Sequence, residues 1–262
     1  MRNAVLVDDA FGPSIESPGD KWVEKAWEAR TAATRVKHAR KALSIDADCI
    51  DAYVLLSHDA ATEAEAIALL REAVRVGDRL FAPVLDHPDM HWWGFIGTRP
   101  YMRAMHELGL ALERARDLAD AEEAYRRLLD LNPNDNQGVR MLLLRLLLDQ
   151  GKLKECKPIL DRYEDDWSLE IMLTNLMLEL DKGTKRAPRK LRAEITKRNE
   201  HVLPMLAEAL RYDSPFAEPE SAFVSLGSED EARSYVANFL EGWRAKKGLP
   251  GKLWDLLAED AG

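Results

Sequence analysis

The sequence is 262 residues long, which is enough for one elongated repeat array or two small domains. Apolar residues make up 46% of it and charged residues 32%, a balance that excludes a wholly disordered chain. The net charge of −9 argues against a general nucleic-acid binder, because contacts between basic residues and phosphates supply most of that affinity.

Cysteine usage and apolar runs bear on the compartment. Cys49 and Cys156 lie far apart in the chain and form no disulfide or metal-binding pattern, so we expect buried thiols in a reducing compartment. No apolar run approaches the length of a membrane span. Asp8 and Asp9 come too soon after Met1 for a signal peptide. These features predict a cytoplasmic protein with no membrane segment.

Helical periodicity begins after an irregular N-terminal stretch. Residues 1–18 contain prolines and a glycine but no sustained period, so they predict an extended N-terminal arm. A helix is expected to open at Asp20, with Trp22, Val23, Ala26 and Trp27 on one side. Three more helices are predicted at about 32–45, 51–61 and 63–76 from the same spacing of apolar residues.

An insertion separates these helices from the next pair. The spacing between matching positions is roughly 20–25 residues longer here than between the first two helix pairs. The extra residues place the insertion at about 77–99. Long insertions in repeat proteins form loops on one face, often the working face. Trp92, Trp93 and Phe95 lie in it. They either plug the gap between neighbouring helix pairs or form an aromatic wall over a binding groove.

Residues 101–138 carry the clearest repeat pattern. One helix has Leu108, Ala111 and Leu112 on a single face, and the next has apolar residues at helical spacing between Ala121 and Leu129. Asn132-Pro133 ends the second helix, because a residue before proline is pushed out of the helical region. A helix pair of about 34 residues with Leu-Gly early, alanine midway and proline at the end resembles the tetratricopeptide repeat.

Further helices are predicted in the C-terminal half. Residues 136–150 are apolar nearly all round, which predicts a buried helix, and its partner follows from Leu153. Helices are also expected at 167–180 and 201–212. Ser228 to Glu231 has the pattern of a capping box, which predicts the start of another helix. Between them, residues 182–198 carry a net charge of +7, which leaves −16 for the rest of the chain.

The predicted fold class is all-α, a right-handed tetratricopeptide-like solenoid of about four to five helix pairs. We assign an extended arm to residues 1–18 and the helical array to 19–211. Residues 212–262 are expected to form a C-terminal helical cap, because a terminal helix must cover the last open apolar face of a solenoid.

Longer strings resemble a narrower group. Thr98-Arg99-Pro100-Tyr101-Met102-Arg103 and Asn132-Pro133-Asn134-Asp135-Asn136-Gln137-Gly138 are the most specific of them. On these residues the chain is similar, over about 20–240, to bacterial relatives of the suppression-of-tumorigenicity-seven family. It departs at Gly97, where that group has a glutamate, and at Glu200, where it has a proline. The resemblance implies the helical-repeat fold and carries no activity with it.

Arginines at predicted helix starts suggest a binding groove. Arg99, Arg103 and Arg140 should line the concave side of the array, and guanidinium groups suit carboxylates and phosphates. These residues either recognise an acidic or C-terminal peptide, or brace the turns between repeats. The lysine-asparagine carboxylate clamp of cochaperone repeats is absent, because Leu110 and Leu144 stand where its polar residues are expected. The residues assigned to partner binding are Trp92, Trp93, Arg99, Tyr101, Arg103, His106, Asn136, Gln137 and Arg140.

Two other functions stay open as alternatives. Asp86, His87, Asp89 and His91 have side chains that suit a metal-dependent hydrolase, although no helical pair organises them. The basic segment 182–198 suits an adaptor that contacts nucleic acid. No phosphate loop, nucleophile elbow or dinucleotide fingerprint implies an enzyme or a cofactor. The sequence therefore predicts a non-enzymatic scaffold without cofactors, which binds an extended peptide or partner helix in its groove.

Overall fold

The computed structural model describes the backbone of residues 6–8 and 12–14, and both backbone and side chains of residues 17–85, 87, 90–212 and 224–259. The regular elements of this part of the chain are helices apart from one short hairpin, in which β1 (Leu6–Asp8) pairs antiparallel with β2 (Gly12–Ser14). The predicted all-α class is confirmed. The chain divides into two compact units, Met1–Val139 and Arg140–Gly262.

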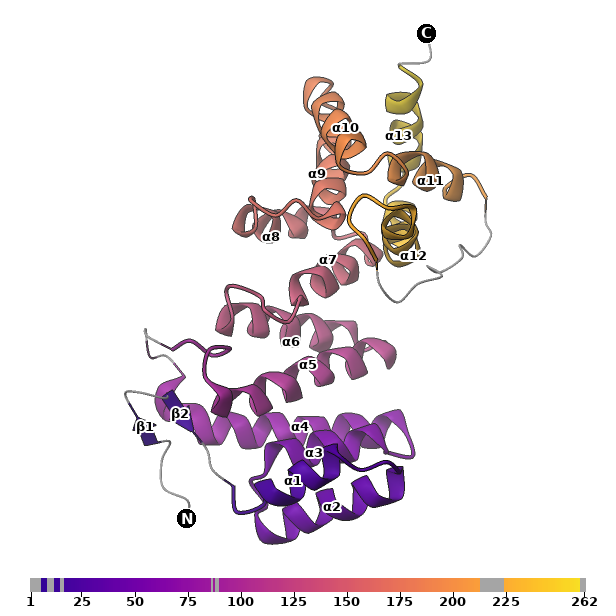
Figure 1. The fold of residues 1–262 in the computed structure, drawn as a ribbon. Helices are drawn as coiled ribbons and strands as arrows, with labels where there is room; N and C mark the ends of the chain where they lie inside the picture. The colour runs from indigo at the N-terminus through magenta and orange to yellow at the C-terminus, as the bar shows by residue number, and fades with distance from the viewer. Residues whose placement is uncertain are drawn as a thin grey trace. The chain divides into compact units, whose positions relative to one another are not determined.

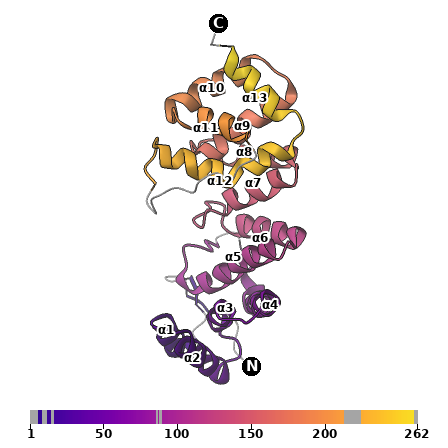
Figure 2. The same cartoon turned by 90° about the vertical axis from the view of Figure 1, so that its right-hand side faces the viewer.

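Helix pairs follow one another through the first unit (Figures 1 and 2). The first helices of the pairs lie next to each other, and each packs against its own second helix. The six helices are α1 (Asp20–Trp27), α2 (Ala32–Ile45), α3 (Ile50–His58), α4 (Glu63–Phe81), α5 (Arg99–Arg114) and α6 (Leu118–Leu131). The bounds predicted for the second helix match α2, whereas α4 extends five residues beyond its predicted end at Val76.

Threonine caps fix where the second helices begin. The Oγ1 of Thr31 accepts from the Thr34 amide at 3.2 Å, and the Oγ1 of Thr62 accepts from the Glu65 amide at 3.2 Å. Glu65 completes the second cap, since its Oε2 accepts from the Ala61 amide at 3.0 Å. Each cap satisfies amide groups that the first turn of a helix leaves without a carbonyl partner.

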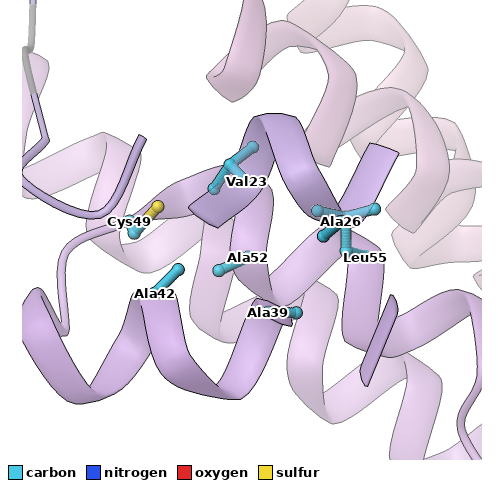
Figure 3. Close-up of a cluster of buried hydrophobic side chains, with 7 residues drawn as sticks. All are labelled: Val23, Ala26, Ala39, Ala42, Cys49, Ala52 and Leu55. Atoms are coloured by element: carbon cyan, nitrogen blue, oxygen red, sulfur yellow. The ribbon is translucent and has the colours of Figure 1, made fainter. Parts of the chain in front are cut away.

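Small side chains make the core of the first helices (Figure 3). Ala26, Ala39, Ala42 and Ala52 are completely buried where α1, α2 and α3 meet, with Val23, Cys49 and Leu55 beside them. Because alanine keeps backbones close together, three helices share one narrow core. Cys49 is buried as predicted for a free thiol, and so is Cys156 in the second unit.

Two tyrosine rings pack against glycines of the preceding helix, so successive helices lie close together. A Cβ added to Gly77 of α4 would lie 2.0 Å from Cδ2 of Tyr101, and one added to Gly109 of α5 would lie 2.4 Å from Cε1 of Tyr125. Real Cβ atoms do not approach that closely. Both glycines are helical, so their role is close packing rather than an unusual backbone conformation.

The predicted insertion at 77–99 is only partly a loop. Its first residues continue α4, and two short 3-10 helices follow, η1 (Ala82–Val84) and η2 (Ile96–Thr98). Trp92 is 3% exposed, with its ring centroid 5.4 Å from that of Phe81 and 5.9 Å from that of Tyr101. The Thr98 hydroxyl donates to the carbonyl oxygens of Trp92 and Phe95. Trp92 thus fills space between α4 and α5.

The second unit is built around α9 (Leu169–Lys182). The helices that pack on it come from both sides in sequence, and α9 is buried on most of its surface. The other elements are α7 (Val139–Asp149), η3 (Leu153–Cys156), α8 (Lys157–Arg162), α10 (Arg186–Arg198), α11 (Val202–Ala209), α12 (Glu229–Ala245) and α13 (Leu249–Ala258). The apolar helix predicted at 136–150 is α7, and it is largely buried.

The predicted division into an arm, an array over 19–211 and a cap over 212–262 stays a prediction. The boundary between the compact units falls between Val139 and Arg140, at the start of α7. Much of the predicted arm, and residues 213–223 of the predicted cap, lie outside the described residues. None of the described helices combines the length and apolar character that a bilayer crossing requires.

Candidate protein-binding face

The first helices of the three pairs present one continuous face in the first unit. We call it the first-helix face and define it by Trp27 of α1, Asp51 and His58 of α3, and Arg103, Glu107 and Arg114 of α5. Residues 103, 107 and 114 recur at helical spacing along α5, so they line one side of that helix. Arg103 contacts Asp51 and the Trp27 ring, and Glu107 lies beside His58.

Trp27 is the apolar residue at one end of this face. It is the last residue of α1 and is 46% exposed, an unusual degree of exposure for tryptophan. The guanidinium carbon of Arg103 lies 5.4 Å from the centroid of its ring. The ring of His58 meets it edge-on, with centroids 6.1 Å apart. Side chains from α1, α3 and α5 therefore converge on one partly exposed indole.

Arg103 is oriented by Asp51. Its Nη1 donates to Oδ1 of Asp51, and the Asp51 side chain is much more buried than that of Arg103. Burial raises the pKa of Asp51, and the nearby Arg103 counteracts part of that rise. The ion pair fixes the guanidinium over the Trp27 ring while leaving much of the arginine side chain exposed to solvent.

The other end of the face is a polar crevice. Its walls include Ser57, His58, Glu63, Glu107 and Arg114, from the end of α3, the start of α4 and the second half of α5. The Nε2 of His58 lies 4.0 Å from Oε2 of Glu107, and Nη2 of Arg114 lies 3.1 Å from Oε1 of Glu63. Exposed pairs of this kind add little stability, so their groups can exchange partners at low cost.

Two aromatic residues assigned to partner binding are core residues. Trp92 is nearly inaccessible, and Tyr101 is fully buried. The Tyr101 hydroxyl donates to Oδ1 of Asp78 at 2.5 Å, and Nη2 of Arg127 donates to both of these oxygens. Of the two roles considered for the aromatic insertion, this placement favours the plug for Trp92. A partner contact by Trp92 or Tyr101 stays a prediction that their burial disfavours.

Trp93 and Arg99 contact each other at the start of α5. The guanidinium carbon of Arg99 lies 5.1 Å from the Trp93 ring centroid, and its Nε donates to the Trp93 carbonyl at 3.2 Å. Both side chains are half-buried. This geometry braces the end of the insertion against α5, the second of the two roles considered for Arg99.

The other assigned residues are dispersed. His106 is half-buried on α5, and burial lowers its pKa. Gln137 donates from Nε2 to the Met102 carbonyl at 3.4 Å, and Asn136 is exposed in the same loop. Arg140 belongs to the second unit, where it pairs with Asp166 at 2.8 Å. Of the assigned set, only Arg103 lies in the cluster around Trp27.

Sequence reasoning missed the other members of that cluster. In the sequence pattern Trp27 shares one side of its helix with Val23 and Ala26, but those two residues are buried whereas Trp27 is 46% exposed. The reason is its position in the last turn of a short helix, where the next helix pair does not cover it. Asp51 and His58 were missed because their alignment with Arg103 and Trp27 depends on how three helices stack.

The alternative sites receive no support from the described part of the chain. Asp86 and Asp89 lie outside it, and no group of three or more histidine, cysteine, aspartate or glutamate residues there could hold a metal ion. In the basic segment, Arg189 pairs with Glu259, Arg198 with Glu231, and Arg192 donates to the Leu256 carbonyl. These cations of α10 attach it to α12 and α13.

Comparison with known proteins gives this face a context. The family model described as ST7 protein matches residues 14–88, and the tetratricopeptide repeat model matches residues 102–135. The two matches together include every residue of the first-helix face. The resemblance inferred from sequence, to a tetratricopeptide protein similar to this family, is confirmed.

Curated relatives are similar over part of their length. A suppressor of tumorigenicity 7 protein-like from Rattus norvegicus is 29% identical over 161 residues, which cover 56% of this chain and 28% of the relative. The Homo sapiens counterpart is 28% identical over 161 residues, covering 56% and 27%. A protein ST7 homolog from Drosophila pseudoobscura pseudoobscura is 25% identical over 256 residues, covering 86% and 46%. The chain thus spans between about a quarter and a half of these relatives.

Proposed function

We propose that this ST7-like tetratricopeptide chain is a protein-binding scaffold that holds an extended peptide or a partner helix on its first-helix face. The observation that carries the proposal is the exposed Trp27 ring, which Arg103 and His58 hold in place from two other helices. Tryptophan and arginine are the residue types that most often dominate binding energy in protein interfaces. A tetratricopeptide repeat supplies the stacked helices that such a face needs.

The residues of the face have distinct roles in this proposal. Trp27 anchors an apolar side chain of the partner, and Arg103 offers its remaining N–H donors to a carbonyl or carboxylate of the partner chain. Asp51 keeps Arg103 in position through their ion pair. The crevice next to His58 takes the continuation of the bound segment, where Glu63, Glu107 and Arg114 provide donors and acceptors of both signs.

The same proposal includes the absence of an enzymatic role and a cytoplasmic location. Support for the first comes from the lack of a catalytic motif in the sequence and from the repeat, since stacked repeats form the extended surfaces that binding proteins use. Support for the second comes from Cys49 and Cys156, which are free and buried and suit a reducing compartment. We propose a protein or peptide partner, and neither a membrane nor nucleic acid.

Affinity capture with three matched baits tests the proposal. Wild type, a Trp27→Ala/Arg103→Ala variant and an Arg75→Ala variant are incubated with native lysate, and the bound proteins are identified by mass spectrometry. Arg75 lies on α4 and pairs with Glu72 in the same helix, so it serves as a control outside the face. We expect a protein that wild type and Arg75→Ala retain and the double variant loses.

The captured protein is then made recombinantly and its Kd is measured against all three baits. Loss of one interface anchor of this kind weakens binding by about tenfold or more. Equal affinity for wild type and the double variant, with both baits folded by circular dichroism, would remove the first-helix face from the proposal.

A further inference from the structure

A short turn in the second unit presents an unusually exposed tryptophan. The turn connects α8 to α9 and consists of residues 163–168, which we call the Trp167 turn. Trp167 is 65% exposed, more than Trp27 on the first-helix face. Single exposed apolar residues are common, but a tryptophan exposed to this extent is the residue type that anchors protein interfaces.

The turn holds the position of Trp167 through hydrogen bonds on either side of it. The Asp166 amide donates to the Tyr163 carbonyl at 3.0 Å, and the Ser168 amide donates to Oδ1 of Asp166 at 2.8 Å. Arg140 donates from Nε to Oδ2 of Asp166 at 2.8 Å. Its guanidinium carbon also lies 5.2 Å from the Tyr163 ring centroid. A loop ordered in this way loses little conformational freedom when a partner binds.

The charges around Trp167 are predominantly negative. Glu164 and Asp165 are exposed next to it, and neither has an ion pair within the described residues. Asp166 is already neutralised by Arg140. Arg162, the residue before the turn, lies against the Tyr163 ring with its guanidinium carbon 5.7 Å from the centroid. An exposed indole with two available carboxylates attracts a cation through both the ring and the charges.

We propose that the Trp167 turn is a second protein-binding surface, which receives a basic segment of a partner protein. A lysine or arginine side chain of that segment stacks on the Trp167 ring, and Glu164 and Asp165 attract its neighbouring positive charges. The partner is basic rather than acidic or a nucleic acid, because the two carboxylates repel anions. The proposal is independent of the first-helix face, since it uses other residues and a partner of defined charge.

A labelled peptide rich in lysine and arginine is the probe for this surface. It is titrated into the full chain at low and physiological salt, and its anisotropy gives the Kd. The same peptide with acetylated lysines and with citrulline in place of arginine is the uncharged control. In parallel, the 1H–15N signal of the Trp167 indole, assigned by its loss in Trp167→Phe, reports whether the peptide reaches this ring.

Three variants separate the proposed surface from general attraction to an acidic protein. Trp167→Ala removes the ring, Glu164→Gln/Asp165→Asn removes the charges, and Glu208→Gln/Asp255→Asn removes two exposed carboxylates elsewhere in the same unit. We expect the first two variants to weaken binding by about fivefold each, the loss that one exposed cation–π contact or charge pair represents. The third should bind like wild type.

Several results would overturn the proposal. These are an unchanged Kd for Trp167→Ala, an equal loss in the Glu208→Gln/Asp255→Asn control, or no binding of the basic peptide by wild type. A dimer without peptide that Trp167→Ala abolishes, seen by analytical ultracentrifugation, would replace the basic partner with a second copy of this chain. Trp27→Ala should bind the basic peptide normally. A failure of the proposal for the Trp167 turn is therefore distinguishable from a failure of the proposal for the first-helix face.

Discussion

At the residue scale, the same side-chain type has opposite roles in different parts of the chain. Trp92 is in the core, where it packs on Phe81 and Tyr101, whereas Trp27 is partly exposed and Trp167 is largely exposed. Apolar periodicity places Trp27 on the same helix side as the buried Val23 and Ala26, because a tryptophan on a helical stripe adds to the apolar pattern whether or not another element covers it. Exposure depends on which neighbours stack there, and that is a tertiary property.

The buried Tyr101 hydroxyl gives a prediction at this scale. It donates to Asp78 and accepts from Arg127, and burial together with the bond to Asp78 raises the pKa of Tyr101 far above its ordinary value. Tyr101→Phe keeps the ring over Gly77 and removes only these bonds. We expect the free energy of unfolding to fall by about 1 kcal/mol, measured by urea denaturation.

Tyr212→Phe is the matched control for that experiment, because Tyr212 is exposed. Its free energy of unfolding should stay within about 0.5 kcal/mol of wild type. If Tyr101→Phe is equally neutral, the hydrogen bonds of the Tyr101 hydroxyl to Asp78 and Arg127 contribute nothing to stability.

At the element scale, the presence of the helices was more predictable than their ends. The limits of α2 follow from its apolar stripe, and Thr31 provides an N-cap at the expected place. In contrast, α4 continues through the first residues of the predicted insertion, because Val76 and Phe81 find partners in the core. The helix α13 was predicted only as part of a cap, since Pro250 and Gly251 interrupt a stretch whose leucines are nevertheless buried at helical spacing.

Helix contacts over glycine lead to a paired prediction. Gly109→Ala places a Cβ 2.4 Å from the Tyr125 ring, so α5 and α6 must separate or the ring must move. Overpacking of this kind costs about 1–3 kcal/mol, which outweighs the gain of up to about 1 kcal/mol in helix propensity. We expect a lower midpoint of thermal unfolding.

Gly251→Ala is the control, because no atom lies within 4 Å of a Cβ added there in α13. It should leave the midpoint unchanged or raise it, since only the propensity gain applies. A midpoint for Gly109→Ala at or above the wild-type value would show that the α5–α6 contact does not need glycine.

The junction of α10 and α12 should be sensitive to acid. Burial alone would raise the pKa of Glu231, but Arg198, Asn199 and the Gly227 amide outweigh it and lower that pKa. One half of the predicted capping box is present, since Oγ of Ser228 accepts from the Glu231 amide. The Glu231 carboxylate accepts from the Gly227 amide instead of the Ser228 amide. A carboxyl with a lowered folded-state pKa stabilises the fold above its unfolded-state pKa, and this contribution is lost as pH falls through the folded-state value.

Glu231→Gln should therefore reduce the free energy of unfolding at neutral pH by about 2 kcal/mol, and the difference from wild type should shrink as the solution is acidified through the carboxylate range. Glu229→Gln removes an exposed partner of Arg233 and should change little at any pH. A Glu231→Gln difference that is constant with pH would contradict the linkage.

At the scale of the whole molecule, the sequence predicted the architecture better than the binding surface. Repeat spacing and the Asn132-Pro133 stop are local signals, and both survive in the structure as α5, α6 and the turn after them. The division between Val139 and Arg140 lies at the start of α7, just after the loop that follows α6, and the sequence prediction did not use that loop as a boundary. The first-helix face combines residues that are distant in sequence, so only the stacking of helices reveals it.

Photocrosslinking from the first-helix face tests the central proposal most directly. A photoreactive phenylalanine analogue replaces His58, next to Trp27 on that face, or Arg75 on α4 as a control, and the chain is irradiated with its captured partner. The proposal predicts a crosslinked product from position 58, whose yield falls when unlabelled wild type is added as a competitor. No such product is expected from position 75. Crosslinking from position 75 and none from position 58 would contradict it.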